Sequence, residues 1–298
     1  MTRFFCFVCL LITSSIHAQY IPKFDVQGYR GSGLKIENTI YNFLTALDSG
    51  VTTLKMDVVI TKDKRVVLSS EPTIALQNCM KDDSSFIAKK YGKSGFNIYQ
   101  MKYAEIQLLT CDGVALGKPL LEDLIVAVEN HIKGYTAYEV DYAIELKSSR
   151  NTEGKFHPEP EAYSDLVYQL IDQYLPLDRI VIQSADFRVL KYWHKRYPEV
   201  RLGVIISNSK SVSANLRELG FTPSVYSINY KLLKQSQIQE LHNKKIRVIP
   251  WTVNELGDMK KLKDWNTDGF VTAYPQRASS LGFGLKFSAP EKKDGSGR

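Results

Sequence analysis

The chain has 298 residues, a formal net charge of +7 and 44% hydrophobic residues. This composition is typical of a globular protein, and it excludes a disordered tail protein, a collagen-like repeat and a polytopic membrane protein. The 39 basic and 32 acidic residues are mixed along the chain and form no blocks. We therefore expect a mildly basic surface and no nucleic-acid partner.

Residues 1–18 have the layout of a secretory signal peptide. Arg3 precedes an apolar run from Phe4 to Ile12, and small and polar residues then lead to Ala18. The run is too short to span a bilayer, which requires about 20 residues. We expect cleavage near Ala18 and a secreted or periplasmic mature chain. A buried N-terminal strand is the alternative.

After this segment, short apolar runs alternate with amphipathic stretches. We expect strands at residues 24–28, 53–58, 66–68, 142–147, 179–184, 201–207, 224–230, 246–254 and 269–274. We expect helices at residues 39–47, 120–131, 159–174, 187–196, 212–219, 233–243, 256–264 and 277–281. Strands that alternate with helices of this length indicate parallel pairing, and about eight such units predict a closed (β/α)8 TIM barrel. A doubly wound open sheet is the alternative, but the glycines after the first strand lack the dinucleotide-binding spacing.

A polar stretch at 71–118 interrupts this alternation after the second strand. We expect it to be an insertion of loops and short helices within a barrel domain that covers 19–287, followed by a disordered tail at 288–298. Cys79 and Cys111 both fall in the insertion, where they form a disulfide or remain two buried thiols. The aromatic residues of the insertion form either a small core or a partner surface; they are Phe86, Tyr91, Phe96, Tyr99 and Tyr103.

Charged residues recur at alternate positions on two of the expected barrel strands. Lys55 and Asp57 share one face of their strand, and Glu145 and Lys147 share one face of another. If these faces point inward, they meet at the mouth of the barrel, where Arg30 from the first loop adds a third cation. Buried charges must be paired or must bind something. The pattern therefore predicts a charge-compensated site that accepts an anion, with an outward-facing, salt-bridged surface as the alternative.

Segments 25–31, 37–39, 50–58, 61–72, 144–147, 183–188, 249–254 and 268–269 together resemble one known family. The family is the glycerophosphodiester phosphodiesterases, in particular their secreted bacterial branch, and the resemblance extends over about residues 24–283. It implies a (β/α)8 barrel with an insertion after the second strand. It also implies hydrolysis of a glycerol phosphodiester to glycerol 3-phosphate and an alcohol, with two histidines as general acid and base and a bound calcium or magnesium ion.

The sequence departs from the family pattern at the catalytic positions. Tyr29 and Ser70 stand where the resemblance places the two catalytic histidines. Tyrosine has an ordinary pKa near 10, and serine does not titrate in the accessible range, so we expect both positions to be inactive. The remaining histidines fall on expected helices or their connections, where we expect surface or hydrogen-bonded roles; they are His131, His157, His194 and His242.

The metal site implied by the resemblance is also altered. Lys55 replaces the first glutamate ligand, while Asp57 and Glu145 match the other two ligands. Because a lysine ammonium only donates hydrogen bonds, it cannot ligate a cation. We therefore expect Lys55 to replace the ion and the protein to need no cofactor. The phosphate and substrate positions of the family are retained as Arg30, Lys147 and Trp251.

Three functions follow from these observations. The first is a secreted pseudoenzyme that binds a phosphate or a glycerophosphodiester without cleaving it. The second is an active phosphodiesterase with altered, metal-free chemistry that uses Tyr29 and Lys55. The third is an interaction protein that binds a partner through the insertion. The loss of both histidines together with a metal ligand favours the first.

Overall fold

The computed structural model describes residues 24–33, 37–74, 90–91, 96–111, 114–115, 118–135 and 139–285. The expected signal peptide and tail, and Cys79 of the expected cysteine pair, lie outside these described residues. Within the described ranges, no helix combines the length and the apolarity that crossing a membrane requires.

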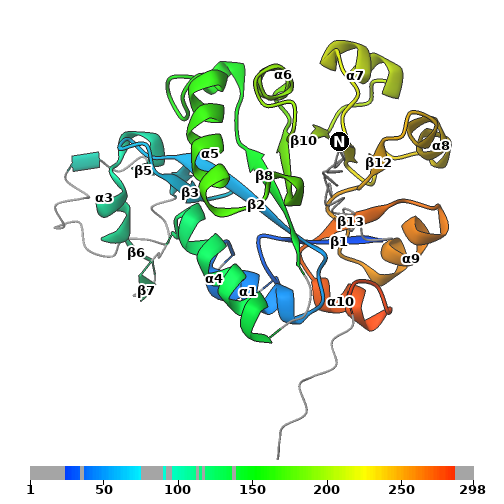
Figure 1. Cartoon of the computed structure of the whole chain (residues 1–298), viewed down its shortest axis with the longest axis horizontal. Helices are drawn as coiled ribbons and strands as arrows, with labels where there is room; N and C mark the ends of the chain where they lie inside the picture. Colours follow the sequence, from blue (N-terminus) through cyan, green and yellow to red (C-terminus); the bar gives the residue numbers. More distant parts are fainter. Residues whose placement is uncertain are drawn as a thin grey trace, which may run out of the picture.

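Eight parallel strands form the wall of a barrel, which confirms the predicted (β/α)8 architecture (Figure 1). The strands are β1 (Asp25–Tyr29), β2 (Thr53–Ile60), β8 (Asp141–Leu146), β9 (Ile180–Ser184), β10 (Arg201–Ile206), β11 (Val225–Ile228), β12 (Arg247–Val248) and β13 (Gly269–Thr272). Their spatial order is β12-β11-β10-β9-β8-β2-β1-β13. Backbone hydrogen bonds from Val271 N to Pro250 O (2.9 Å) and from Val253 N to Val271 O (2.8 Å) close the remaining gap.

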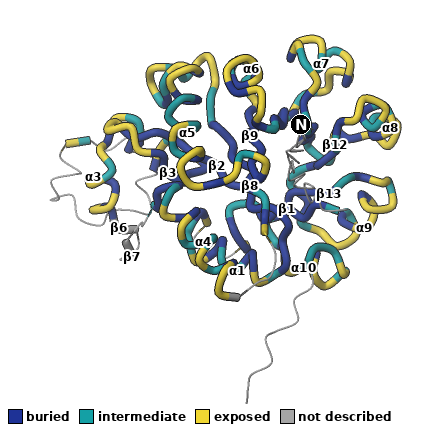
Figure 2. Tube along the Cα trace, in the orientation of Figure 1, coloured by how far each residue is buried: buried dark blue, intermediate teal, exposed yellow. Residues whose placement is uncertain are grey.

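Helices surround this wall, with their inner faces buried and their outer faces exposed (Figure 2). They are α1 (Ile40–Asp48), α4 (Leu121–Tyr135), α5 (Pro160–Tyr174), α6 (Phe187–Arg196), α7 (Val212–Leu219), α8 (Gln235–Asn243), α9 (Leu256–Asp264) and α10 (Pro275–Ser280). Side-chain caps fix where several of them begin, since Thr39, Asp186 and Ser211 accept hydrogen bonds from backbone N–H groups of the first turns of α1, α6 and α7.

The strand expected at 246–254 is wrong in length. Regular strand geometry is confined to Arg247–Val248. Pro250 has no N–H group to give to a ladder, so the regular strand pattern is interrupted there. Pairing with β11 nevertheless continues, because Ile249 N donates to Tyr226 O at 3.1 Å and Trp251 N donates to Ile228 O at 2.9 Å. Trp251 lies at the barrel mouth, as expected.

The insertion packs against β2 and its antiparallel partner β3 (Val66–Leu68). Its described elements are β4 (Thr73–Ile74), β5 (Phe96–Asn97), the 3-10 turn η2 (Ile98–Gln100), α3 (Tyr103–Gln107), β6 (Thr110–Cys111) and β7 (Val114–Ala115). Phe96 is fully buried in a small separate core, which Tyr91 and Tyr103 also contact, while Tyr99 packs on the main core. Packing therefore accounts for these four aromatic residues; Phe86 lies outside the described residues.

The loop after β1 has a glycine that its backbone requires. Gly31 has φ +108°, and a Cβ atom on it would lie 2.4 Å from Asn42 Cβ and 2.9 Å from the Asn42 backbone carbon. The loop is closed by a hydrogen bond from Asn38 N to Arg30 O (3.0 Å). It therefore packs directly on α1, and this packing sets the position of Arg30.

We predict that Gly31→Ala lowers the free energy of unfolding by about 2 kcal/mol or more, because it combines a strained φ with a clash against α1 backbone. Urea denaturation measures the loss. Gly257→Ala is the control, since a Cβ there meets nothing within 4 Å; its stability should be unchanged or slightly raised. Equal effects of both substitutions would contradict the packing argument.

Candidate functional site

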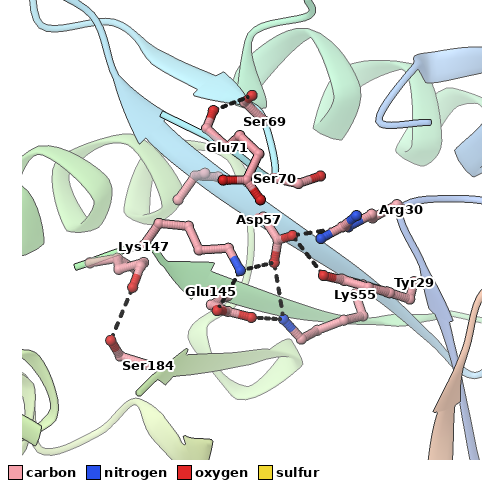
Figure 3. Close-up of polar contacts among 12 residues, drawn as sticks. Tyr29, Arg30, Lys55, Asp57, Ser69, Ser70, Glu71, Glu145, Lys147 and Ser184 are labelled. Carbon is pink, nitrogen blue, oxygen red and sulfur yellow. Dashed lines mark hydrogen bonds and ion pairs between the residues drawn. The ribbon is translucent and has the colours of Figure 1, made fainter. Parts of the chain in front are cut away.

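The predicted charged residues converge inside the C-terminal end of the barrel (Figure 3). Tyr29 on β1 is in register with Lys55 on β2, and Asp57 is in register with Glu145 on β8. Lys55, Asp57 and Glu145 are 3%, 0% and 8% exposed. The predicted inward orientation of these side chains is therefore correct. The alternative, an outward-facing, salt-bridged surface, is excluded for these strands.

Asp57 is the centre of the cluster. Its Oδ2 accepts a hydrogen bond from the Tyr29 hydroxyl at 3.0 Å and one from Arg30 Nε at 3.3 Å. Its Oδ1 lies 3.4 Å from Lys55 Nζ and 3.6 Å from Lys147 Nζ. One buried carboxylate thus has contacts with three cations and a phenol.

Glu145 binds the two lysines more closely. Lys55 Nζ donates to Oε2 at 2.6 Å, and Lys147 Nζ lies 2.8 Å from Oε1. Burial favours the neutral acid, but Lys55 and Lys147 outweigh burial and lower the pKa of Glu145 to about 2. At Asp57 the balance is reversed. Burial and the negative charge of Glu145 raise the pKa of Asp57, and they outweigh the lowering effect of the cations Lys55, Lys147 and Arg30.

The phenol of Tyr29 is held in its neutral form. Burial and the negative charge of Asp57 raise the pKa of Tyr29 far above its ordinary value of 10.0, although Arg30 acts in the opposite direction. The cation of Arg30 lies 4.3 Å from the ring centroid and Lys55 Nζ lies 5.5 Å from it. Both cations lie against the face of the ring, and the lowering effect of Arg30 on the pKa of Tyr29 is outweighed by burial and by Asp57.

Ser70 lies beside the cluster and forms hydrogen bonds with Asn38 and Glu37. Its hydroxyl accepts from Asn38 Nδ2 at 2.7 Å and donates to Glu37 Oε1 at 3.0 Å. Glu37 also receives two hydrogen bonds from Arg30 NH1, at 3.0 and 3.1 Å. Arg30 therefore links the Ser70 contacts to Asp57.

Two cations retain access to solvent. The side chains of Arg30 and Lys147 are 24% and 28% exposed, whereas that of Lys55 is 4% exposed. Lys147 lines both an inner cavity of about 80 Å³ and a neighbouring groove of about 310 Å³. The inner cavity is bounded by Tyr29 and Trp251 as well, so four of the predicted site residues, Tyr29, Glu145, Lys147 and Trp251, line one cavity.

Lys118 was missed by the sequence analysis. Its ammonium donates to Ser69 Oγ at 2.9 Å, and Ser69 in turn donates to the Glu71 carbonyl oxygen at 2.7 Å (Figure 3 shows the second bond). Burial lowers the pKa of Lys118 to about 8, although Glu37 opposes this effect. The only sequence signal was one lysine before Pro119 at the end of the insertion, which was too weak to place it.

The four described histidines have structural roles, as expected. His157 is buried; its Nε2 accepts from Ser149 N at 3.0 Å, and its Nδ1 lies 2.8 Å from the Pro158 carbonyl oxygen. His131 pairs with Asp48 and His242 with Asp268, each at 2.8 Å. His194 stacks on Phe221, with ring centroids 4.1 Å apart.

Comparison with known proteins decides the family. The model of the glycerophosphoryl diester phosphodiesterase family matches residues 27–277. The chain belongs to this family. A glycerophosphodiester phosphodiesterase of Bacillus subtilis is 27% identical over 257 residues, which cover 83% of this chain and 82% of the relative.

Solved structures agree on the fold. A structure from Silicibacter pomeroyi matches with a TM-score of 0.73 at 23% identity, covering 89% of this chain and 95% of that one. A phosphodiesterase of Oleispira antarctica, solved in complex with the product sn-glycerol-3-phosphate, matches with a TM-score of 0.69 at 20% identity, covering 86% and 95% of the two chains. The chain is thus a glycerophosphodiester phosphodiesterase-like protein with the family's TIM barrel.

The divalent ion of this family does not fit the residues present. Lys55 Nζ lies between the two carboxylates, 2.6 Å from Glu145 and 3.4 Å from Asp57. Among the described residues, no group of three or more His, Cys, Asp or Glu side chains is arranged to hold a metal. A divalent cation at this position would meet the Lys55 ammonium, which repels it.

We predict that Lys55→Met lowers the free energy of unfolding by about 3–5 kcal/mol, because it leaves two buried carboxylates with less compensating charge. Urea denaturation at neutral pH measures it. Arg65→Met is the matched control: it removes a half-exposed cation that pairs with Glu122 at 2.5 Å, and it should cost about 1 kcal/mol or less. If Lys55→Met lowers the free energy of unfolding no more than Arg65→Met does, Lys55 does not compensate the charge of the two carboxylates.

We predict a pH-dependent effect of Lys118→Met. The lysine has a pKa of about 8 when folded and an ordinary value of 10.5. Between these values the unfolded state binds more protons, so wild type gains stability relative to the variant as pH rises from 8 to 10.5. Below that window the folded state carries the full cost of the buried charge. Paired denaturation curves at several pH values give the difference, and a constant difference would contradict the burial of the ammonium.

Proposed function

We propose that this protein is a secreted member of the family that binds a phosphate or glycerophosphodiester at the barrel mouth without hydrolysing it. The observation that carries the proposal is the contact of Lys55 Nζ with Glu145 at 2.6 Å and with Asp57 at 3.4 Å. This contact supports replacement of the divalent ion by a side chain.

The contacts of Tyr29 and Ser70, the two expected catalytic positions, support catalytic silence. General acid–base catalysis contributes about 10²–10⁴-fold and requires groups that titrate near the working pH. The Tyr29 hydroxyl donates a hydrogen bond to Asp57, and the pKa of Tyr29 is raised by burial and by the charge of Asp57. Ser70 is held between Asn38 and Glu37. Metal-free chemistry through Tyr29 therefore has no support from these contacts.

Two partly exposed cations of the cluster support binding of an anion. The partly exposed Arg30 guanidinium and Lys147 ammonium provide N–H donors of the kind that binds phosphate oxygens.

We predict that the variant Tyr29→His, Lys55→Glu, Ser70→His gains calcium- or magnesium-dependent hydrolysis of glycerophosphodiesters, while wild type is silent. The substitutions supply two titratable groups and a third carboxylate for the ion. Release of sn-glycerol 3-phosphate from glycerophosphocholine, with calcium, with magnesium and with chelator, measures it.

Wild-type turnover that resists the chelator would overturn the proposal in favour of metal-free chemistry. The control is Tyr29→His alone, which should remain silent because the ammonium of Lys55 is still present. Calorimetric titration of calcium into wild type should give no binding at this cluster.

The localisation is part of the same proposal. The apolar run from Phe4 to Ile12 followed by small residues up to Ala18 supports export and cleavage. N-terminal sequencing of the protein recovered outside the cytoplasm should begin at Gln19. An intact Met1 would contradict export by cleavage.

A further inference from the structure

A separate groove of about 580 Å³ lies beside the barrel mouth, and the proposed function does not use it. We call it the outer groove. Its walls come from α6, α7 and the loops that follow β8, β9 and β10, which are neighbouring strands of the barrel. Its volume is in the range of about 300–1,000 Å³ that small-molecule sites have. Four cations and two carboxylates line it: Arg150, Arg188, Lys191, Lys210, Asp186 and Glu218.

The carboxylate of Asp186 is fully engaged within the protein. Its Oδ1 accepts hydrogen bonds from the backbone N of Arg188 at 3.0 Å and from Arg188 Nε at 3.1 Å. Its Oδ2 accepts from Arg188 NH2 at 2.7 Å and from the Ser148 hydroxyl at 2.8 Å. Arg188 NH1 also donates to Glu153 Oε2 at 2.5 Å. Arg188 is therefore used to compensate acidic side chains, and other residues must supply the free cations of the groove.

Two other cations of the outer groove are available to a ligand. Arg150, at the start of the 3-10 turn η3 (Arg150–Thr152), and Lys191 on α6 are exposed, and neither forms an ion pair within the described part of the chain. Lys210 pairs with Glu218 at 2.7 Å, but both side chains are about half exposed, so water weakens this pair. The outer groove therefore has an excess of positive charge that no carboxylate of the described chain compensates.

The outer groove adjoins the proposed site of the first phosphate. Ser148 and Ser149 line both the outer groove and the groove of about 310 Å³ that Lys147 also lines. Ile205 lines both the outer groove and the inner cavity. Lys147 and Arg150 are three residues apart, so their Cα atoms are at most about 11 Å apart. A ligand whose phosphate lies against Lys147 can therefore extend into the outer groove.

We propose that the outer groove binds a second anionic group, a phosphate ester on the alcohol moiety of the diester, through Arg150 and Lys191. This inference rests on the proposed function and names the class of ligand: a glycerophosphodiester whose alcohol is itself phosphorylated. A guanidinium offers paired N–H donors that match two phosphate oxygens, and an ammonium adds a compact charge. A phosphate monoester has about 1.5 to 2 negative charges at pH 7, which matches two unpaired cations.

The test uses two probes that differ by one phosphate group, glycerophosphoinositol and glycerophosphoinositol 4-phosphate. Calorimetry on the full-length chain at constant ionic strength should show that wild type binds the phosphorylated probe about tenfold more tightly. The double variant Arg150→Met, Lys191→Met should remove this preference. It should change the affinity for glycerophosphoinositol by less than about twofold, because neither residue contacts the first phosphate in this arrangement.

The matched control is the double variant Lys244→Met, Lys260→Met. It removes the same charge from the C-cap of α8 and from α9, and neither lysine lines the outer groove. It should keep the wild-type preference, which separates a local contact from an effect of net charge.

The outcomes distinguish this inference from the proposed function. If wild type binds both probes equally, or if Arg150→Met, Lys191→Met keeps the preference, the inference is wrong while the proposed function stands. If wild type binds only the phosphorylated probe, and does so through Arg150 and Lys191, the outer groove is an anion site and the proposed function is wrong. If wild type binds neither probe, both are wrong.

Discussion

Two carboxylates inside the barrel, Asp57 and Glu145, determine which side chains and which loop conformation must surround them. Moving such charges out of water is costly unless cations and hydrogen bonds surround them. Here Lys55 is supplied by the same strand as Asp57, Lys147 follows Glu145, and Arg30 arrives from the first loop. The loop must therefore hold a backbone with positive φ at Arg30 and Gly31, and it does so by packing on α1.

In the function that we propose, the same arrangement separates anion binding from catalysis. The cations that compensate the carboxylates also favour an anion, while Tyr29 and Ser70, at the expected catalytic positions, are engaged in hydrogen bonds. Tyr29 is an example: its hydroxyl donates a hydrogen bond to Asp57, and its ring lies against the Arg30 guanidinium. A phenol with those two roles stabilises the cluster and is a poor acid.

Sequence patterns predicted the barrel and the core of the site because both follow from residue patterns that repeat every few positions. Alternation placed Lys55 beside Asp57, and the regular order of strands and helices indicated that their ends meet. The prediction failed where a single residue decided the geometry. Pro250 shortened β12, and Lys118 lay next to a polar stretch with no periodicity to orient it.

In the function that we propose, the ammonium between the carboxylates also limits how a site for a divalent ion can arise here by mutation. Lys55→Glu alone would place three carboxylates within the same small volume and remove the charge that balances two of them. That intermediate is destabilised unless a cation is present at sufficient concentration. Whether a site for a divalent ion can form therefore depends on the concentration of that ion when Lys55 is replaced. The effects of the single changes are not additive, and the order in which they occur decides which paths are open.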